Sequence, residues 1–143
     1  MNEGAIIALL GRAKEKAHIF IENELAKNGI KDLSVSNGSI LFILFKNNGK
    51  TTIKEIVEIL DKTKSTVSDK VFSLEKAGYV TKRQDTEDKR VVFVELTEKG
   101  YATKEIFANV SLKLISQIYT DISDEEKKIL VELVKKVGDN LKG

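Results

Sequence analysis

The sequence of 143 residues contains no cysteine, no proline and only one histidine. The absence of cysteine excludes disulfides, thiol-based redox sensing and thiolate metal sites. With a single histidine as well, we expect no metal site and no cofactor. The sequence also lacks a Gly-rich phosphate loop, a nucleophile with a partnering base and a metal-spaced ligand set. We therefore predict no catalytic residue and no enzymatic activity.

Long apolar runs are missing too, since no stretch approaches the ~18 apolar residues that span a membrane. The N-terminal apolar run is too short for a secretory signal, so we expect a soluble, cytoplasmic protein with no membrane partner. Hydrophobic residues make up 41% and charged residues 32%, which is enough for one packed domain over residues 1–143. Net charge is only +2, so any affinity for polyanions has to come from a local patch.

The apolar spacing predicts four helices in the first half of the chain. A stripe with steps of three and four covers Ala5 to Lys27, and a buried helix is expected over Ser36–Lys46. Thr52 and Glu55 have the spacing of a capping box that opens a short helix. A second short helix is predicted over Lys64–Lys76. Two short amphipathic helices joined by a few residues are typical of a helix-turn-helix.

The pattern then changes to β-branched and aromatic residues at 79–83 and 91–96, which predicts a β-hairpin with a charged tip at 84–90. Thr97 is expected to cap a helix that runs to about Tyr119. Ser123 and Glu126 form a second capping-box pattern before the last helix. The expected fold class is mainly α with a small β-hairpin (α+β).

Positive charge is concentrated between residues 62 and 90, where eight cations face five anions, while the remainder of the chain carries −1. The first turns of the second short helix also carry hydroxyls that suit a phosphate or a base edge. Taken alone, Thr63 could simply cap that helix and the serines could be solvated. Their place between a helix-turn-helix and a charged hairpin favours contact with DNA.

Residues Ser65–Gly100 resemble the winged helix of the multiple-antibiotic-resistance regulator (MarR) family of transcription factors. The recognition helix and its exit are matched by Ser65–Ser68 and Leu74–Val80, and with the helix order the resemblance covers essentially the whole chain. The family's wing signature, D-x-R, three residues, an aliphatic, x, L-T-x-x-G, is met by Asp88, Arg90, Val94, Leu96, Thr97 and Gly100.

The resemblance implies a winged helix-turn-helix lobe over 34–97 and dimerisation helices over 1–33 and 98–143. It also implies a homodimeric regulator, most often a repressor, on a pseudo-palindromic operator of double-stranded DNA. Two recognition helices would then enter major grooves ~34–36 Å apart. Long apolar stripes in the terminal helices agree with such pairing. A winged helix that docks a protein without binding DNA is the alternative, and steep salt dependence distinguishes DNA binding from it.

By similarity, Arg90 enters the minor groove and Lys89 contacts a nearby phosphate. Asp88 and Arg90, one residue apart, can pair and so hold the guanidinium. The full set of expected DNA contacts is Thr52, Lys62, Thr63, Lys64, Ser65, Thr66, Ser68, Asp69, Lys70, Asp88, Lys89 and Arg90.

Two residues of the recognition helix depart from expectation. Many family members have an arginine at the position of Asp69, which faces the DNA here and can accept from a cytosine amine. Phe72 also points outward, where it either packs against a neighbouring helix or touches a thymine methyl group.

The resemblance further implies a small aromatic or anionic effector bound between the two parts of the molecule. Candidate effector-binding residues are His18, Phe42 and Phe45. Ordinary core packing is the alternative for the two aromatic residues, and a solvated or interface position is the alternative for the histidine.

Overall fold

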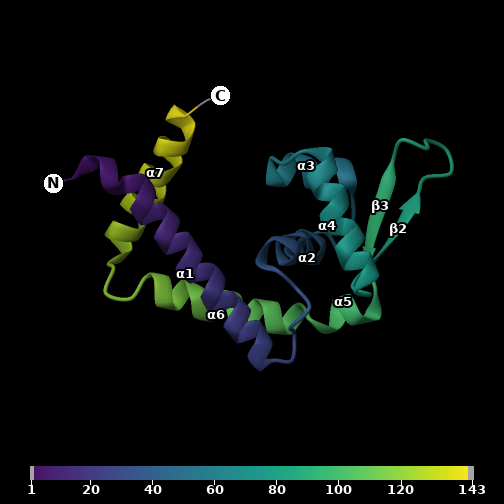
Figure 1. The fold of residues 1–143 in the computed structure, drawn as a ribbon, viewed down its shortest axis with the longest axis horizontal. Coiled ribbons are helices and arrows are strands. Elements are labelled where there is room, and N and C mark those ends of the chain that lie inside the picture. The colour runs from purple at the N-terminus through teal and green to yellow at the C-terminus, as the bar shows by residue number, and fades with distance from the viewer. Residues whose placement is uncertain (1, 142–143) are drawn as a thin grey trace.

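The computed structural model describes residues 2–141 and contains a small three-stranded sheet among helices (Figure 1). A short 3-10 helix, Glu3–Ala5, precedes the first α-helix. The elements are α1 (Ile6–Lys27), α2 (Val35–Lys46), β1 (Lys50–Thr52), α3 (Ile53–Leu60), α4 (Lys64–Lys76), β2 (Val80–Gln84), β3 (Val92–Leu96), α5 (Glu98–Ala102), α6 (Lys104–Ile118) and α7 (Asp124–Asn140).

The sheet has the order β1-β3-β2, with both pairings antiparallel. The hairpin of β2 and β3 confirms the prediction, and its register places Val80 opposite Leu96. The sequence analysis missed β1, in which Thr51 lies opposite Val94. Strand β1 is three residues long, too short for an alternation pattern, and its partner lies far along the chain.

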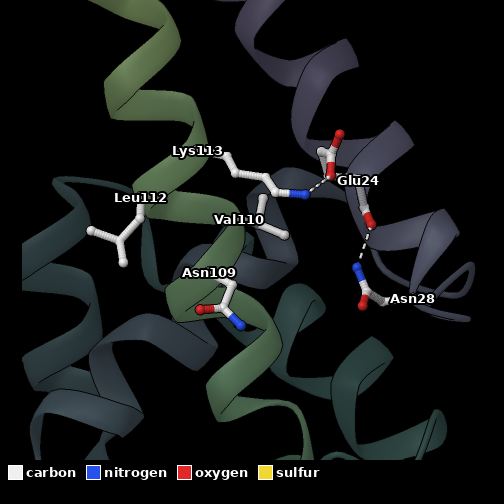
Figure 2. Close-up of a pocket in the computed structure, with 6 residues that line it drawn as sticks. All are labelled: Glu24, Asn28, Asn109, Val110, Leu112 and Lys113. Atoms are coloured by element: carbon white, nitrogen blue, oxygen red, sulfur yellow. Dashed lines mark hydrogen bonds and ion pairs between the residues drawn. The ribbon is translucent and has the colours of Figure 1, made fainter.

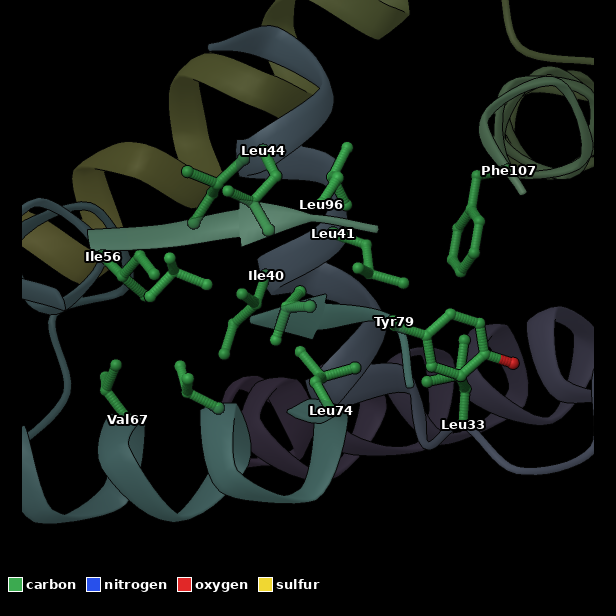
Figure 3. Close-up of a cluster of buried hydrophobic side chains, with 14 of the residues drawn as sticks. Leu33, Ile40, Leu41, Leu44, Ile56, Val67, Leu74, Tyr79, Leu96 and Phe107 are labelled. Atoms are coloured by element: carbon green, nitrogen blue, oxygen red, sulfur yellow. The ribbon is translucent and has the colours of Figure 1, made fainter. Parts of the chain in front are cut away.

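Apolar side chains of α2, α3, α4 and the sheet form one core, which Leu25 of α1 and Phe107 and Val110 of α6 join from the side (Figure 3). Helix α2 crosses this core, and its Ile40, Leu41 and Leu44 are fully buried, as the run of apolar residues predicted. Tyr79 lies at the edge of the core with its ring buried. The core fixes α3, α4 and the hairpin relative to one another.

The long helices α1 and α6 pack against each other beside this lobe (Figure 1). Helix α7 contains no buried residue, and its apolar side chains, such as Leu133, are exposed. No helix in the described part of the chain is long and apolar enough to cross a membrane.

One helix expected from Thr97 to about Tyr119 is instead two, α5 and α6, which meet at Thr103. The Thr103 hydroxyl donates to the Gly100 carbonyl at 2.7 Å, and the Thr103 N–H donates to the same oxygen at 3.2 Å. This tight turn ends α5 after five residues. The apolar stripe of the sequence continues through the break, so it gave no sign of it.

The two expected capping boxes have different outcomes. Ser123 and Glu126 form the reciprocal pair at the start of α7 as predicted. At α3, Thr52 accepts from the Glu55 N–H, but the Glu55 carboxylate accepts from the Thr51 hydroxyl at 2.6 Å and not from the cap N–H. Thr51 is buried in β1, where its hydroxyl needs a partner. That part of the prediction was wrong.

Candidate nucleic-acid interface

Helices α3 and α4 are joined by a turn of three residues, which confirms the helix-turn-helix. Asp61 ends α3 in the left-handed conformation with φ 51°. Thr63 then caps α4 by accepting from the Thr66 N–H at 3.1 Å. Aspartate tolerates the left-handed region because its short polar side chain hydrogen-bonds locally. The turn thus sets α4 at a fixed angle on the lobe.

Helix α4 buries one face and presents the other to solvent. Val67, Val71 and Leu74 have no exposed surface. The opposite face carries exposed side chains at steps of four, three and four residues, which are Ser65, Asp69, Phe72 and Lys76. An outward row of this kind on the second helix is what a major groove receives in helix-turn-helix proteins.

The hydroxyls at the start of α4 are partly engaged within the protein. Thr63 donates to the Thr66 hydroxyl at 2.8 Å as well as capping the helix. Ser65 is exposed and Ser68 half-buried. Capping therefore accounts for Thr63, while Ser65 remains accessible to a ligand. Lys62 and Lys64 flank this end of the helix and Lys70 lies in its middle, and none of these lysines forms an ion pair within residues 2–141.

The tip of the hairpin extends beyond the lobe as a wing (Figure 1). The Asp85 N–H donates to the Val91 carbonyl at 2.9 Å, and the Gln84 amide donates to the Lys89 carbonyl at 2.6 Å. These bonds close the loop across its base. Lys89 and Arg90 are exposed at the tip.

Asp88 and Arg90 form the predicted pair. The guanidinium donates from Nε to Oδ1 of Asp88 at 3.1 Å and from Nη2 to Oδ2 at 3.2 Å, and the Arg90 N–H also donates to Oδ1. These hydrogen bonds from Arg90 lower the pKa of the Asp88 carboxyl. Arg90 is 91% exposed, so the pair holds a cation in one pose in open solvent.

The wing is fastened to the lobe at Thr97 and Gly100, the last residues of the family signature. Thr97 caps α5 by accepting from the Gly100 N–H, and its hydroxyl donates to the Gly78 carbonyl at the end of α4. A Cβ at Gly100 would lie 2.4 Å from the Tyr79 carbonyl oxygen. The signature glycine is therefore required by the close approach of α5 to the start of β2.

Sequence reasoning missed a group of cations on the outer face of the sheet. The Phe93 ring lies between Lys50, 4.4 Å from its centroid, and Arg83 at 4.8 Å. Glu95 pairs with both cations, at 3.8 and 3.4 Å. The register that brings β1 beside β3 creates this cluster. Because β1 was not predicted from the sequence, the cluster was not predicted either.

A polar cluster joins three segments at the base of the lobe. Asp32, in the loop after α1, accepts from the Tyr79 hydroxyl and from Lys99 at 3.2 Å. Lys99 also donates to the Ala77 carbonyl at the end of α4, at 2.7 Å. The Tyr79 hydrogen bond, followed by Lys99, lowers the pKa of Asp32, while burial raises the pKa of Tyr79.

Two adjoining depressions lie between α1 and α6, and Figure 2 shows the first of them. The first, of about 330 Å³, is lined by Glu24 of α1, by Asn28 directly after that helix and by Asn109, Val110, Leu112 and Lys113 of α6. Glu24 is buried, and it pairs with Lys113 at 3.2 Å and Lys27 at 3.1 Å. The second depression, of about 450 Å³, adds Phe20, Ser116 and Gln117.

The candidate effector residues lie outside both depressions. Phe42 and Phe45 pack edge-on and tilted against Phe107, with ring centroids 5.3 and 5.8 Å away. His18 is half-buried on α1. Over residues 2–141, no three acidic or histidine side chains gather where they could hold a metal ion.

Comparison with known proteins agrees with this geometry. A family model described as "Winged helix DNA-binding domain" matches residues 33–100. The HTH-type transcriptional repressor YetL of Bacillus subtilis (strain 168) is 30% identical over 136 residues, which are 94% of this chain and 79% of that protein.

Solved structures share the fold over nearly the whole chain. A MarR protein from Peptoclostridium difficile superposes with a TM-score of 0.83 at 23% identity, covering 97% of this chain and 88% of that one. FabT of Streptococcus pneumoniae, solved in complex with DNA, superposes with a TM-score of 0.79 at 21% identity, covering 98% and 97%. The winged helix and its flanking helices thus form one known arrangement.

Proposed function

Because this chain belongs to the MarR family of winged helix-turn-helix transcriptional regulators, which are DNA-binding proteins and not enzymes, we propose that two copies of it hold one pseudo-palindromic operator. The observation that carries the proposal is the exposure of the outward row of α4 together with the Asp88–Arg90 fork at the wing tip. Helix α4 packs against β2, the strand that leads into the wing, so the lobe holds the two elements beside each other.

The two elements have separate roles in this proposal. The start of α4, with Lys64, Ser65 and Asp69, lies in the major groove. Arg90 reaches the minor groove, where narrow A·T-rich stretches concentrate negative potential. Contacts to phosphates then fix the register. The remaining proposed contacts are Thr52, Lys62, Thr63, Thr66, Ser68, Lys70, Asp88 and Lys89.

Pairing of two copies is supported by apolar side chains that the single chain leaves uncovered. They lie on the arm helices α1, α6 and α7, and they include Ile6, Ile7, Leu9, Ile19, Leu112, Ile115, Ile118, Ile129, Leu130 and Leu133. Monomeric proteins rarely expose contiguous apolar area on this scale. A symmetric dimer through residues 1–33 and 98–143 would cover it and space the two recognition helices.

We further propose that the protein acts as a repressor in the cytoplasm, as the name of YetL states for that relative, and that a small aromatic or anionic effector releases it. The depressions between α1 and α6 support an effector site, since they adjoin the Phe20 ring and the Lys113 ammonium. His18, Phe42 and Phe45 remain proposed effector residues.

The decisive experiment measures binding of the purified protein to its own upstream region and to sequences selected from a random duplex library. Affinity should fall with salt at a log–log slope close to the number of phosphates neutralised. Binding to a protein partner without this salt response, and no enrichment of any duplex, would instead indicate a protein-docking module.

Arg90→Ala tests the wing. Because the variant loses the contact of Arg90 in the minor groove, operator binding should weaken by about tenfold. The dimer and its melting temperature should stay unchanged. Arg12→Ala removes the same charge from α1 and should have little effect. Unchanged affinity of the Arg90 variant would remove the wing from the proposed interface.

A further inference from the structure

The outward row of α4 contains a carboxylate and a phenyl ring where a DNA-facing helix usually carries cations. Asp69 is exposed and forms no ion pair within residues 2–141. Phe72, one turn further, is 55% exposed and lies outside the core cluster. The structure thus decides against the packing of Phe72 on a neighbouring helix, and both side chains face the same space.

The surroundings of Phe72 match a polyanion. Lys76 of α4 and Lys82 of β2 place their ammonium groups 6.0 and 5.9 Å from the centroid of the ring. Lys82 also forms an ion pair with Glu75 at 3.6 Å, while Lys76 forms no ion pair in the described chain. An exposed apolar ring rimmed by cations fits a surface with apolar groups between phosphates, which a major groove provides at thymine methyl groups.

The chemistry of a carboxylate narrows what Asp69 can contact. It repels phosphates, so in a groove it has to meet a hydrogen-bond donor on a base. In the major groove the donors are the amines of cytosine and adenine, and adenine places its N7 acceptor beside its amine. That acceptor repels a second carboxylate oxygen. The cytosine amine has an acceptor on one side only, the O6 of the paired guanine, whereas the adenine amine lies between its own N7 and the thymine O4, so cytosine is the preferred partner.

Helix geometry places the two side chains at neighbouring base pairs. Three residues advance an α-helix by about 4.5 Å, and base pairs follow one another every ~3.4 Å. We propose, on the premise of the operator binding described above, that Asp69 and Phe72 read a cytosine and a thymine in adjacent base pairs of each half-site. Asp69 accepts from the cytosine N4 amine, and Phe72 covers the thymine 5-methyl group.

The test uses the full-length protein and duplexes selected from a random library. The enriched half-site should contain a C·G pair next to a T·A pair. Replacing that thymine by deoxyuracil removes only the methyl group and should weaken binding about fourfold in one half-site. Replacement in both half-sites should weaken it about fifteenfold.

Variants assign the effects to the two residues. Phe72→Ala should bind the thymine and deoxyuracil duplexes equally, and Phe72→Leu should keep the difference because it keeps an apolar side chain. Asp69→Asn should shift the preference from cytosine toward adenine, which takes both a donor and an acceptor. Ile59→Ala, an equally exposed apolar residue on α3, should retain the wild-type preferences.

The outcomes separate this inference from the proposed function. If no duplex is enriched at all, operator binding itself fails. If a half-site is enriched but Phe72→Ala keeps the thymine preference, the reading of the methyl group by Phe72 is wrong while operator binding stands. A half-site without cytosine at the Asp69 position, or one unaffected by Asp69→Asn, overturns the role of Asp69. Circular dichroism of each variant checks that these exposed substitutions leave the fold intact.

Discussion

The winged lobe buries its apolar residues within one chain, whereas helix α7 leaves its own largely exposed. In the lobe, Leu41, Leu44 and Val71 lose all their surface to neighbours from the same chain. In α7 no residue is buried, and Leu133 is 53% exposed. The comparison teaches that one chain suffices to fix α4 and the wing relative to each other. In the proposed dimer, the distance between the two α4 helices depends on the second copy.

The largest effect is expected from substitutions in α7 that prevent two copies from pairing. Leu133→Asp combined with Val137→Asp places two carboxylates on the apolar side of α7, so the protein should sediment as a monomer. Specific binding should then drop to the non-specific level, a loss of about 10³-fold or more. Lys135→Asp, on the polar side of the same helix, should leave a dimer with full affinity. A monomer with undiminished operator affinity would contradict the dependence of function on pairing.

In that monomeric variant, substitutions in the lobe and in α7 should change the free energy of unfolding by different amounts. Leu44→Ala removes a fully buried side chain of the lobe and should lower the free energy of unfolding by about 2–5 kcal/mol. Leu130→Ala changes an exposed side chain of α7 and should cost less than about 0.5 kcal/mol. Urea denaturation measures both. Equal losses would mean that the arms are packed within one chain.

A Gly→Ala substitution should lower stability in the lobe and raise it in α7. Gly100→Ala forces a Cβ against the Tyr79 carbonyl and should lower the free energy of unfolding by about 1–3 kcal/mol. Gly138→Ala lies in α7 with open space around it and should raise the stability of that helix by about 0.5–1 kcal/mol. Thermal melts of the monomeric variant compare them. If Gly138→Ala weakens the wild-type dimer, the partner packs closely at that position.

The smallest expected effect is on how the stability of the protein depends on pH in the acid range. The pKa of Asp32 is lowered in the folded state, so its hydrogen bonds stabilise the protein above the ordinary pKa of 3.8 and are lost as pH falls through the lowered value. Asp32→Asn should therefore reduce the melting temperature slightly at neutral pH and flatten its decline below about pH 4. Because Asp32 is about half exposed, the change should stay within about 1 kcal/mol. An unchanged acid decline would exclude this cluster as a source of stability.

Hydrogen bonds between side chains and their close neighbours in the sequence could be predicted. The Asp88–Arg90 fork, the Thr97 cap and the Ser123–Glu126 box each depend on side chains within three positions, so spacing alone indicated them. The buried face of α4 followed from helical periodicity for the same reason.

Features that depend on distant partners were not predictable. Strand β1 exists because β3 offers it an edge, and Glu55 turns to Thr51 only because that strand buries the Thr51 hydroxyl. The break at Thr103 is different, because local hydrogen bonds from Thr103 to the Gly100 carbonyl close it and the apolar stripe does not reveal them. For β1 and Glu55, a tertiary contact overrides the local pattern, and the sequence shows only the local pattern.

The Lys99 ammonium group donates both to Asp32 and to the carbonyl of Ala77, the residue that caps the end of α4, and so connects two segments that are far apart in the sequence. The loop that follows α1 and the far end of α4 are both held by it, so neither can move without straining or breaking a bond to the other. A displacement of α1, whatever produces it, would therefore reach the end of α4 and the start of β2 through Asp32, which accepts from both Lys99 and the Tyr79 hydroxyl. Removal of the Lys99 ammonium group would loosen the end of α4 while leaving the hydrogen bond from Tyr79 to Asp32 in place.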